Sequence, residues 1–341
     1  MESVTKPSIG VLLLNLGGPD SLAAVQPFLY NLFSDREIIR LGPPFLQKPL
    51  AWLISSLRSS KTRAAYARIG GRSPIREITS AQAKALEDVL NESRVTSHES
   101  QIAVYVGMRY WQPFVGDTVR RMYEEGIRKV IVLTLYPHYS VATTGSSLSN
   151  LKNVLAAYPE VSVNTIESWY DHPLYIDALV ESVSRGLASF ASGPEPRTLN
   201  VELDVHLLFS AHSLPRKFVD EGDPYVDQIM ATVKAVAARF SNPWKLSYQS
   251  KSGPVAWLEP STEQMLQEMA SEGVKNLLVV PISFVSDHIE TLYEIDMLYK
   301  EMAAGLGMRL ERAESLNLSP AFISALKDIV VQGMKEAGWN E

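Results

Sequence analysis

The chain has 341 residues, 46% hydrophobic and 21% charged, a composition typical of a folded globular protein that excludes extended disorder and a membrane-embedded chain. Thirty-two basic and thirty-eight acidic side chains give a net charge of −6, which does not favour nucleic acid as a partner. Cysteine is absent, which excludes disulfides, thiolate nucleophiles and cysteine-ligated zinc or iron–sulfur sites. The length corresponds to about two domains of roughly 150 residues each.

The first structured stretch is residues 9–16, whose nearly unbroken apolar character predicts a buried strand. A turn at Gly17-Gly18-Pro19 and a helix over 21–33 follow. The glycine pair lacks the full GxGxxG spacing, so no dinucleotide is inferred. The apolar stretch is short and interrupted by Asn15, unlike a secretory signal or a membrane span. We therefore expect a cytoplasmic protein.

An apolar segment with three prolines covers residues 41–57. Pro49 suits a first helical position, and the apolar side chains after it recur at helical spacing. The stripe consists of Leu50, Leu53, Ile54 and Leu57. Packing in the core explains such a stripe, whereas an exposed stripe would form a lip over an apolar ligand or touch lipid. The basic side chains that follow, from Arg58 to Arg68, form either a solvated face or a site for carboxylates.

Strands and helices then alternate along the rest of the first half. Helices are predicted over 78–91 and 115–125, and strands over 102–106 and 129–135. This alternation predicts a parallel sheet with helices on both faces.

The second half repeats this pattern. Residues 125–132 match residues 272–279 at an offset of about 147 positions, which indicates two related halves joined between Val163 and Pro173. The predicted helices are 174–190, 225–240 and 262–271, and the predicted strands are one ending near His212, 245–249 and 276–280.

His212 is the first candidate for chemistry. Leu207 to Phe209 form an apolar run typical of a strand covered on both faces, and Pro215 disfavours a helix at the preceding residue. His212 therefore lies at the carboxyl end of a strand, where open α/β sheets place their ligands. A histidine in this place can equally be a structural residue that only bonds a neighbouring carbonyl.

A second cluster follows the strand 276–280. If a helix starts near Asp287, then Asp287, Glu290 and Glu294 share one of its faces. The apolar face would contain Leu292, Ile295 and Tyr299. The helix dipole favours carboxylates in a first turn but leaves Glu294 unexplained, because like charges four residues apart repel. A bound cation would remove that repulsion, and together with His212 the cluster resembles an oxygen and nitrogen site for a divalent metal.

Two classes of function fit these residues. A two-domain module could capture a small ligand in a cleft, whereas an enzyme would need both a proton-accepting His212 and the carboxylates. The combination of a base with several carboxylates favours the enzyme, because it exceeds what capture requires.

Several motifs, in chain order, resemble the ferrochelatase family, which inserts ferrous iron into a porphyrin in haem biosynthesis. The most specific is the run from Leu208 to Pro215 followed by Glu221-Gly-Asp-Pro-Tyr225. The other matching motifs are Leu14–Pro19, Tyr66 with Ile69–Gly71 and Ser73-Pro74, Tyr136–Ser147, Gln249–Pro254 with Trp257, and Ser286–Glu294. The resemblance covers nearly the whole chain.

The resemblance implies an α/β fold with two Rossmann-like, chelatase-type domains, each a parallel sheet flanked by helices, and an active-site cleft between them. The first domain would cover residues 1–165, with the apolar lip at 41–57, and the second residues 166–341. The last helix, about 320–337, could return to the first domain.

The resemblance also assigns roles to residues. His212 and Glu290 match the metal-site pair of the family, and His288 and Glu294 match its neighbouring acidic path; these four are the expected catalytic residues. The positions that match the porphyrin pocket are Arg58, Tyr66, Ser73, Arg109, Tyr110 and Trp257.

The implied reaction is insertion of Fe²⁺ into protoporphyrin IX with release of two protons, the terminal step of haem synthesis. Coproporphyrin III as the substrate, a cobalt or nickel tetrapyrrole chelatase, and a porphyrin carrier are the alternatives. A long apolar lip resembles that of protoporphyrin enzymes. The expected partners are a porphyrin and Fe²⁺, with peripheral contact to the inner membrane face through the lip as an option. Fe²⁺ is a substrate, no resident cofactor is expected, and the absence of cysteine excludes the iron–sulfur cluster of animal members.

Overall fold

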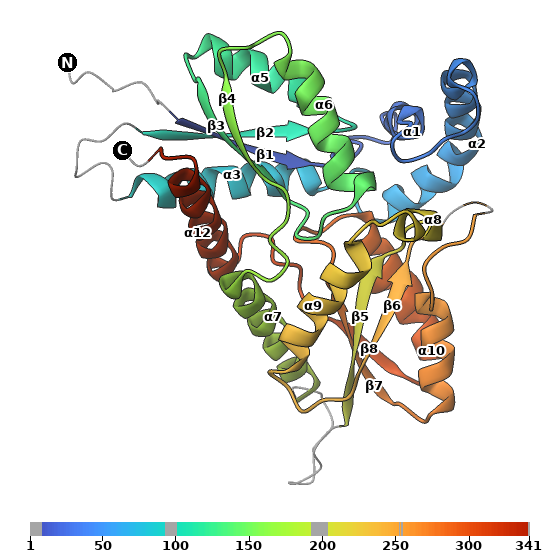
Figure 1. The fold of residues 1–341 in the computed structure, drawn as a ribbon. Coiled ribbons are helices and arrows are strands. Elements are labelled where there is room, and N and C mark those ends of the chain that lie inside the picture. Colours follow the sequence, from blue (N-terminus) through green and yellow to red (C-terminus); the bar gives the residue numbers. More distant parts are fainter. Residues whose placement is uncertain (1–8, 93–100, 192–203, 252, 254, 340–341) are drawn as a thin grey trace. The chain divides into compact units, whose positions relative to one another are not determined.

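The chain was analysed as a computed structural model, which describes residues 9–92, 101–191, 204–251, 253 and 255–339. The described residues divide into two compact units (Figure 1). One runs to Trp169 and resumes at Asn317, and the other runs from Tyr170 to Leu316. Within these residues, no helix combines the length and the apolar character that crossing a lipid bilayer requires.

The first unit contains a four-stranded sheet in the order β2-β1-β3-β4, with every neighbouring pair parallel. Its elements are β1 (Ile9–Asn15), α1 (Val25–Ser34), the 3₁₀ turn η1 (Pro44–Leu46), α2 (Gln47–Arg68), α3 (Ile75–Asn91), β2 (Ile102–Met108), α5 (Val115–Glu124), β3 (Lys129–Thr134), the π-type turn η2 (Val141–Gly145), α6 (Ser146–Leu155), β4 (Ser162–Ile166) and α12 (Pro320–Glu336).

Helices cover both faces of this sheet (Figure 1). On one face, Leu12 and Val132 pack against Val119 of α5 and Leu151 of α6 in a single apolar cluster. All seven residues of β1 are buried, which is expected of a central strand covered on both sides.

Helix α12 belongs to the first unit although it is the last element of the chain. The Asn164 side chain of β4 donates a hydrogen bond to the Gly333 carbonyl at 2.7 Å, and Trp169 stacks on Phe322 at 6.1 Å between ring centroids. A Cβ at Gly333 would lie 2.9 Å from the Ile166 side chain, so glycine permits the close approach of α12 to β4. The sequence interpretation placed the domain boundary at 165/166 and allowed the last helix, about 320–337, to return to the first domain. The contacts divide the chain after Trp169 and place the segment from Asn317 onward in the first unit.

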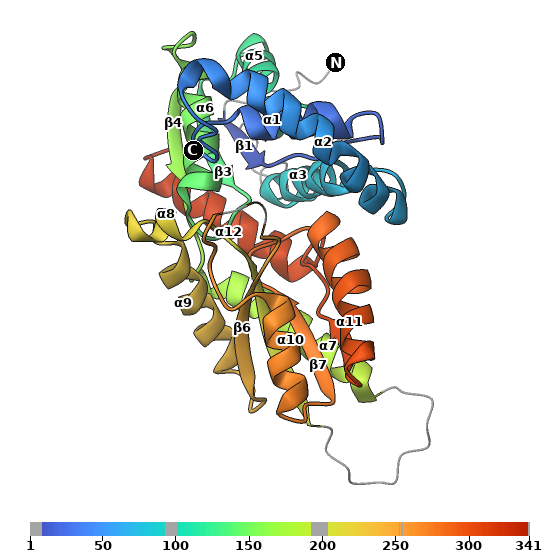
Figure 2. The same cartoon turned by 90° about the vertical axis from the view of Figure 1, so that its right-hand side faces the viewer.

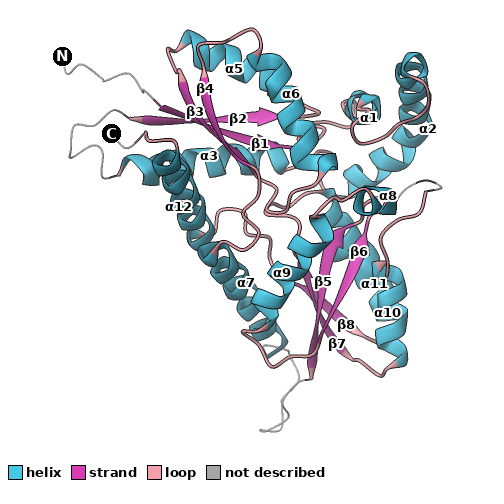
Figure 3. Ribbon diagram, viewed as in Figure 1, coloured by secondary structure: helices cyan, strands magenta, loops and turns pink. Residues whose placement is uncertain are grey.

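The second unit contains a parallel sheet in the equivalent order, β6-β5-β7-β8 (Figure 3). Its elements are α7 (Pro173–Ala191), β5 (Val205–His212), α8 (Arg216–Asp220), α9 (Tyr225–Ala237), β6 (Trp244–Gln249), α10 (Thr262–Ser271), β7 (Asn276–Pro281), the π-helix η3 (Glu290–Tyr299), α11 (Lys300–Gly305) and β8 (Arg309–Arg312).

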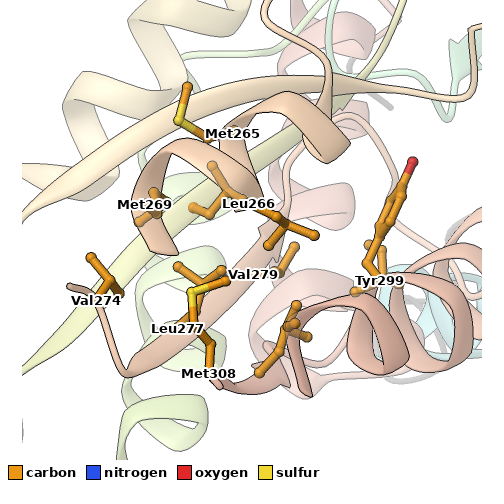
Figure 4. Packing of buried hydrophobic residues seen from close by; sticks show 12 residues of the cluster. Met265, Leu266, Met269, Val274, Leu277, Val279, Tyr299 and Met308 are labelled. Carbon is orange, nitrogen blue, oxygen red and sulfur yellow. The ribbon is translucent and has the colours of Figure 1, made fainter. Parts of the chain in front are cut away.

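Helices α9 and α10 lie on opposite faces of this second sheet (Figure 2). On the α10 side, buried apolar residues form one cluster in which Leu266 and Met269 pack against Leu277 and Val279 of β7 (Figure 4). Tyr299 of η3 belongs to the same cluster, so η3 is fixed to the sheet by its apolar residues. The predicted apolar face of this segment is therefore confirmed at Ile295 and Tyr299, both of which are buried.

The predicted alternation of strands and helices is confirmed, and so is the parallel sheet in each half. The offset of about 147 aligns β3 with β7 residue for residue, Lys129 with Asn276 and Thr134 with Pro281. Of the edge strands, β4 and β8 were not predicted. Their residues, Ser-Val-Asn-Thr-Ile and Arg-Leu-Glu-Arg, lack the apolar run that marks a buried strand.

Helix α2 has an unusual distribution of side chains. The residues that it buries are mostly small or polar, and they include Gln47, Ala51, Ser55 and Ser59. Its large apolar side chains face solvent instead, with Trp52 60% exposed and Leu57 74% exposed. Of the predicted stripe, Leu53 and Leu57 are exposed while Leu50 and Ile54 are partly buried, so the exposed interpretation fits part of the stripe.

Candidate active site

The polar side chains of the second unit gather where its strands end. His212 is the last residue of β5 and is paired in register with Gln249, the last residue of β6. The neighbouring strand β7 ends at Pro281, and its continuation leads to η3, which begins at Glu290. In a parallel sheet these carboxyl ends lie along one edge, the usual position of a ligand site.

His212 and Glu290, the predicted metal-site pair, are in direct contact. His212 Nδ1 lies 2.7 Å from Glu290 Oε2. The His212 backbone is also fixed, because its N–H donates to Ser283 Oγ at 2.9 Å and its carbonyl accepts from the Tyr225 hydroxyl at 3.0 Å. With Nδ1 directed at the carboxylate, Nε2 is the ring nitrogen available for a substrate.

The electrostatics favour a charged His212–Glu290 pair. Burial acts to lower the pKa of His212, but the Glu290 carboxylate reverses this, and the net pKa lies above the ordinary value. Burial likewise acts to raise the pKa of Glu290, but the His212 charge and hydrogen bond bring it below its ordinary value. Each group therefore stabilises the ionised form of the other.

Glu294, four residues further along η3, behaves in the opposite way. Burial raises the pKa of its carboxyl group, and the nearby Glu290 charge raises it further. Its Oε2 accepts hydrogen bonds from Ser250 Oγ at 2.5 Å and from Gln249 Nε2 at 3.2 Å. Two carboxyl groups on one helix therefore differ in their readiness to hold a proton.

His288 is buried and is linked to His212 through the Phe284 ring. Its ring is 4.2 Å from the Phe284 ring, centroid to centroid, and Phe284 in turn lies edge-on to His212 at 6.1 Å. Nδ1 is 3.1 Å from the Ser286 carbonyl, a geometry in which Nδ1–H donates and Nε2 carries the lone pair. Within the described part of the chain, the buried Nε2 has no hydrogen-bond partner. Burial lowers the pKa of His288, so the neutral ring is favoured.

The prediction that Asp287 shares an acidic face with Glu290 and Glu294 is wrong. Asp287 Oδ1 accepts hydrogen bonds from Arg312 at 3.0 Å and from Ser315 at 2.8 Å. The partly buried Asp287 carboxylate is compensated by the guanidinium of Arg312, which lies on an edge strand. The helix also differs from the expectation, because η3 is a π-helix that begins at Glu290 rather than near Asp287.

The carboxylates and histidines do not form a resident metal cage. Among the described residues, no group of three or more His, Asp or Glu side chains is placed to hold a metal ion. A structural zinc site, for comparison, has four protein ligands. The pair His212–Glu290 would therefore supply only part of the coordination of any metal that it binds.

In the first unit, Arg109 and Tyr110 meet around a carboxylate that the sequence interpretation missed. Asp35 Oδ2 accepts hydrogen bonds from Arg109 Nη2 at 2.8 Å, the Tyr110 hydroxyl at 2.6 Å and Ser146 Oγ at 2.5 Å. Burial acts to raise the pKa of Asp35, but the Ser146 and Tyr110 hydrogen bonds and the Arg109 charge lower it. Much of the Arg109 charge is therefore balanced within the protein.

The other predicted pocket residues of this unit have different environments. Arg58 is exposed, with its guanidinium carbon 5.5 Å from the centre of the Phe33 ring. Tyr66 and Ser73 are both buried. A Cβ at Gly18 would lie 2.5 Å from Ser73 Oγ, so the Gly17-Gly18 turn packs directly on Ser73.

Trp257, the remaining pocket residue, belongs to the second unit. The segment around it is held beside the residues that follow His212, because Leu258 N–H donates to the Leu214 carbonyl and Arg216 N–H donates to the Ala256 carbonyl, both at 2.9 Å. Within the described residues its buried indole Nε1 has no hydrogen-bond partner.

Sequence reasoning assigned no role to Asp35, Ser146, Gln249 or Ser250. A signal existed for two of them, because Gln249 and Ser250 stand at the carboxyl end of a predicted strand, the criterion that identified His212. No such signal pointed to Asp35, whose side-chain partners Arg109 and Tyr110 are 74 or more positions away in the sequence.

Comparison with known proteins extends this description. A family model described as ferrochelatase matches residues 8–334. The ferrochelatase of Geotalea uraniireducens is 52% identical over 323 residues, covering 94% of this chain and 96% of that protein. The ferrochelatase of Gloeothece citriformis is 47% identical over 339 residues, covering 97% of this chain and 84% of that protein.

A solved structure, SirB from Bacillus subtilis with Fe3+, matches with a TM-score of 0.55 at 9% identity and covers 98% of this chain and 99% of its own. At this identity the likeness concerns the fold alone. It agrees with two α/β units, each a parallel sheet flanked by helices, of the chelatase type.

Proposed function

The chain belongs to the ferrochelatase family of porphyrin metal chelatases, which are lyases, and from this membership we propose that it inserts Fe²⁺ into protoporphyrin IX as the terminal step of haem synthesis. The reaction replaces two pyrrole N–H protons with one metal ion. The site must therefore accept two protons and present a divalent metal to the same ring.

The observation that carries the proposal is the 2.7 Å contact between His212 Nδ1 and Glu290 Oε2. In its neutral form, with Nδ1–H donating to Glu290, His212 accepts one of the two pyrrole protons at Nε2, and the Glu290 carboxylate stabilises the imidazolium that forms. The same carboxylate is a hard oxygen ligand that can bind Fe²⁺ while the porphyrin is metalated. His288, kept neutral by burial with Nε2 unoccupied by any described group, and Glu294 continue the route for protons or metal.

Porphyrin binding is assigned to Arg58, Tyr66, Ser73, Arg109 and Tyr110 of the first unit and to Trp257 of the second. Support comes from their side chains: exposed Arg58 offers a cation for a carboxylate, and the indole N–H of Trp257 has no partner among the described residues. The partly balanced charge of Arg109 points to a weaker electrostatic contribution from that residue than from Arg58.

The substrate is proposed to be protoporphyrin rather than coproporphyrin because of the exposed apolar residues of η1 and α2. Phe45, Trp52 and Leu57 are each at least 60% exposed, a cost in water that an apolar ligand or surface would offset. Fe²⁺ acts as a substrate here, and no resident cofactor is proposed. Contact with the inner membrane face through the same residues remains part of the proposal.

One assay tests the function directly. The purified protein is incubated anaerobically with Fe²⁺, Co²⁺ or Ni²⁺ and with protoporphyrin or coproporphyrin, and metalation is followed in the visible spectrum. The proposal expects fastest metalation with Fe²⁺ and protoporphyrin. Preference for coproporphyrin would change the substrate, preference for Co²⁺ or Ni²⁺ would make it another chelatase, and binding without metalation would indicate a carrier.

Two variants test the roles of the central pair. His212→Ala should abolish metalation and leave porphyrin binding measurable, whereas His206→Ala, on the same strand β5, serves as the matched control and should keep activity. Glu290→Gln should raise the KM for Fe²⁺. An unchanged dependence on Fe²⁺ concentration would count against a metal role for Glu290.

A further inference from the structure

Ser250, directly after β6, has a backbone conformation that L-residues rarely adopt. Its φ angle is +67°, and among the described residues only one other non-glycine residue, Asn317, has a positive φ. Asparagine tolerates the left-handed region, and glycine enters it freely, but serine gains nothing intrinsic there. A strained conformation at this position therefore indicates that the Ser250 side chain has a role.

The Ser250 hydroxyl bridges the two carboxyl groups of η3. Its Oγ lies 2.8 Å from Glu290 Oε2 and 2.5 Å from Glu294 Oε2. Two carboxylates four residues apart on one helix repel when both are charged. The hydroxyl donates its single proton to one of these oxygens, and the other carboxyl group, when it carries a proton, donates to Oγ, so the hydroxyl holds the two groups together.

The neighbouring residue completes this bridge. Gln249 Nε2 donates to the Glu290 carbonyl at 3.1 Å and to Glu294 Oε2 at 3.2 Å. The orientation of the Gln249 amide is fixed by a second hydrogen bond, which Ser210 Oγ of β5 donates to Gln249 Oε1 at 2.6 Å. The end of β6 thus contacts both the backbone and the side chains of the first turn of η3.

We propose that Ser250 is a positioning residue for the metal substrate, whose hydroxyl holds Glu290 and Glu294 side by side so that Fe²⁺ can pass between them. This inference rests on the proposed function. The hydrogen bonds of the Ser250 hydroxyl go to Glu290 and Glu294, so we expect its effect on the handling of metal and not on the binding of the ring. It acts through the carboxylates, which are the groups that contact the metal.

A merely structural role for Ser250 makes a different prediction. If residue 250 served only to turn the chain after β6, glycine would be at least as good as serine, and any loss of activity would follow the loss of stability. Under the proposal, metal handling follows the presence of the hydroxyl group, whatever happens to stability.

Three variants separate these possibilities: Ser250→Ala removes the hydroxyl and keeps the Cβ, Ser250→Gly also relieves the backbone, and Ser250→Thr keeps the hydroxyl but adds a branch that the positive φ disfavours. For each, the thermal midpoint, the KM for Fe²⁺, the KM for protoporphyrin, and calorimetric binding of Co²⁺ without porphyrin are measured. The Ala and Gly variants should show about a tenfold rise in the KM for Fe²⁺ and about a tenfold loss of Co²⁺ affinity, the size expected for a hydrogen bond to a charged group.

The KM for protoporphyrin should stay unchanged in the Ala and Gly variants, and the Gly variant should melt no lower than the Ala variant. The Thr variant should melt lower than the wild type and still keep its Fe²⁺ dependence. Wild-type Fe²⁺ and Co²⁺ behaviour in the Ala and Gly variants would overturn the inference, as would equal rises in both KM values. The wild-type protein must first metalate protoporphyrin in the same assay. If it does not, the proposed function has failed, and this is distinct from a failure of the Ser250 inference.

Discussion

The guanidinium of Arg312 binds the carboxylate of Asp296 through two hydrogen bonds of 2.8 Å, from Nε to Oδ1 and from Nη2 to Oδ2. A third bond runs from Arg312 Nη1 to Asp287 Oδ1 at 3.0 Å. One side chain on the edge strand β8 thus holds both the residue before His288 and a residue within η3. This side chain therefore ties the segment that carries His288, Glu290 and Glu294 to the edge of the sheet.

Replacing Arg312 by Leu should lower the free energy of unfolding by about 2–3 kcal/mol, because Asp287 would be left partly buried without its cation. This expected loss of stability is small for the breaking of a buried ion pair, because the Asp296 side chain is 35% exposed. Arg309→Leu is the matched control on the same strand. Its contact with Glu311 is more exposed, so chemical denaturation should show a change below about 1 kcal/mol. Equal losses in the two variants would contradict a special role for Arg312.

Gly18→Ala should destabilise the protein and weaken porphyrin binding. The new methyl group would lie 2.5 Å from Ser73 Oγ and 2.6 Å from Ser73 Cβ, so Ser73 must move, at a cost of about 1–3 kcal/mol. Gly116→Ala provides the control: its Cβ would meet Val154 at an ordinary 3.7 Å, and within α5 alanine is favoured over glycine. Thermal melting and fluorescence titration with protoporphyrin measure both effects. An unchanged affinity for protoporphyrin in Gly18→Ala would show that Ser73 does not contribute to porphyrin binding.

Stability should depend on pH through His138, which is only 2% exposed. Burial lowers the pKa of His138 from 6.5 to about 3 in the folded state. Between these values the unfolded chain binds a proton that the folded protein does not, so this contribution is complete above pH 6.5 and is lost as pH falls. The free energy of unfolding should decrease by up to about 1.4 kcal/mol per pH unit.

The His138→Gln variant, which carries no titrating group at this position, should lose that part of the dependence. Denaturant unfolding at about pH 7, 6 and 5, from just above the window into its upper half, compares the two slopes. Parallel curves for the variant and the wild type would show that His138 is protonated without cost in the folded protein.

Replacing Trp52 and Leu57 by Ser should raise the KM for protoporphyrin and change that for coproporphyrin little. Both side chains are mostly exposed, so stability should change by no more than about 0.5 kcal/mol. Leu174→Ser, at a half-exposed apolar position of α7, controls for a general loss of apolar surface. If both porphyrins respond alike, the exposed residues of α2 do not select the substrate.

Local patterns in the sequence were sufficient to predict the repeating strands and helices and the site at the strand ends, whereas the pairing of His212 with Glu290 was predicted from the family resemblance. They succeeded because a buried parallel strand must be continuously apolar and because parallel strands end together at one edge. Both properties are expressed within a few consecutive residues. The same reasoning missed β4 and β8, since an edge strand needs no apolar run.

Only the tertiary structure decided which charged and polar side chains pair with one another. Asp287 and Glu290 are three positions apart, yet one is bound by Arg312 and the other by His212. Asp35 joins Arg109 and Tyr110 across more than 70 positions, and Ser250 reaches two carboxylates some 40 positions away. Such partners are chosen by the distances between side chains once the sheets have formed, because a buried charge is stable only beside the groups that compensate it.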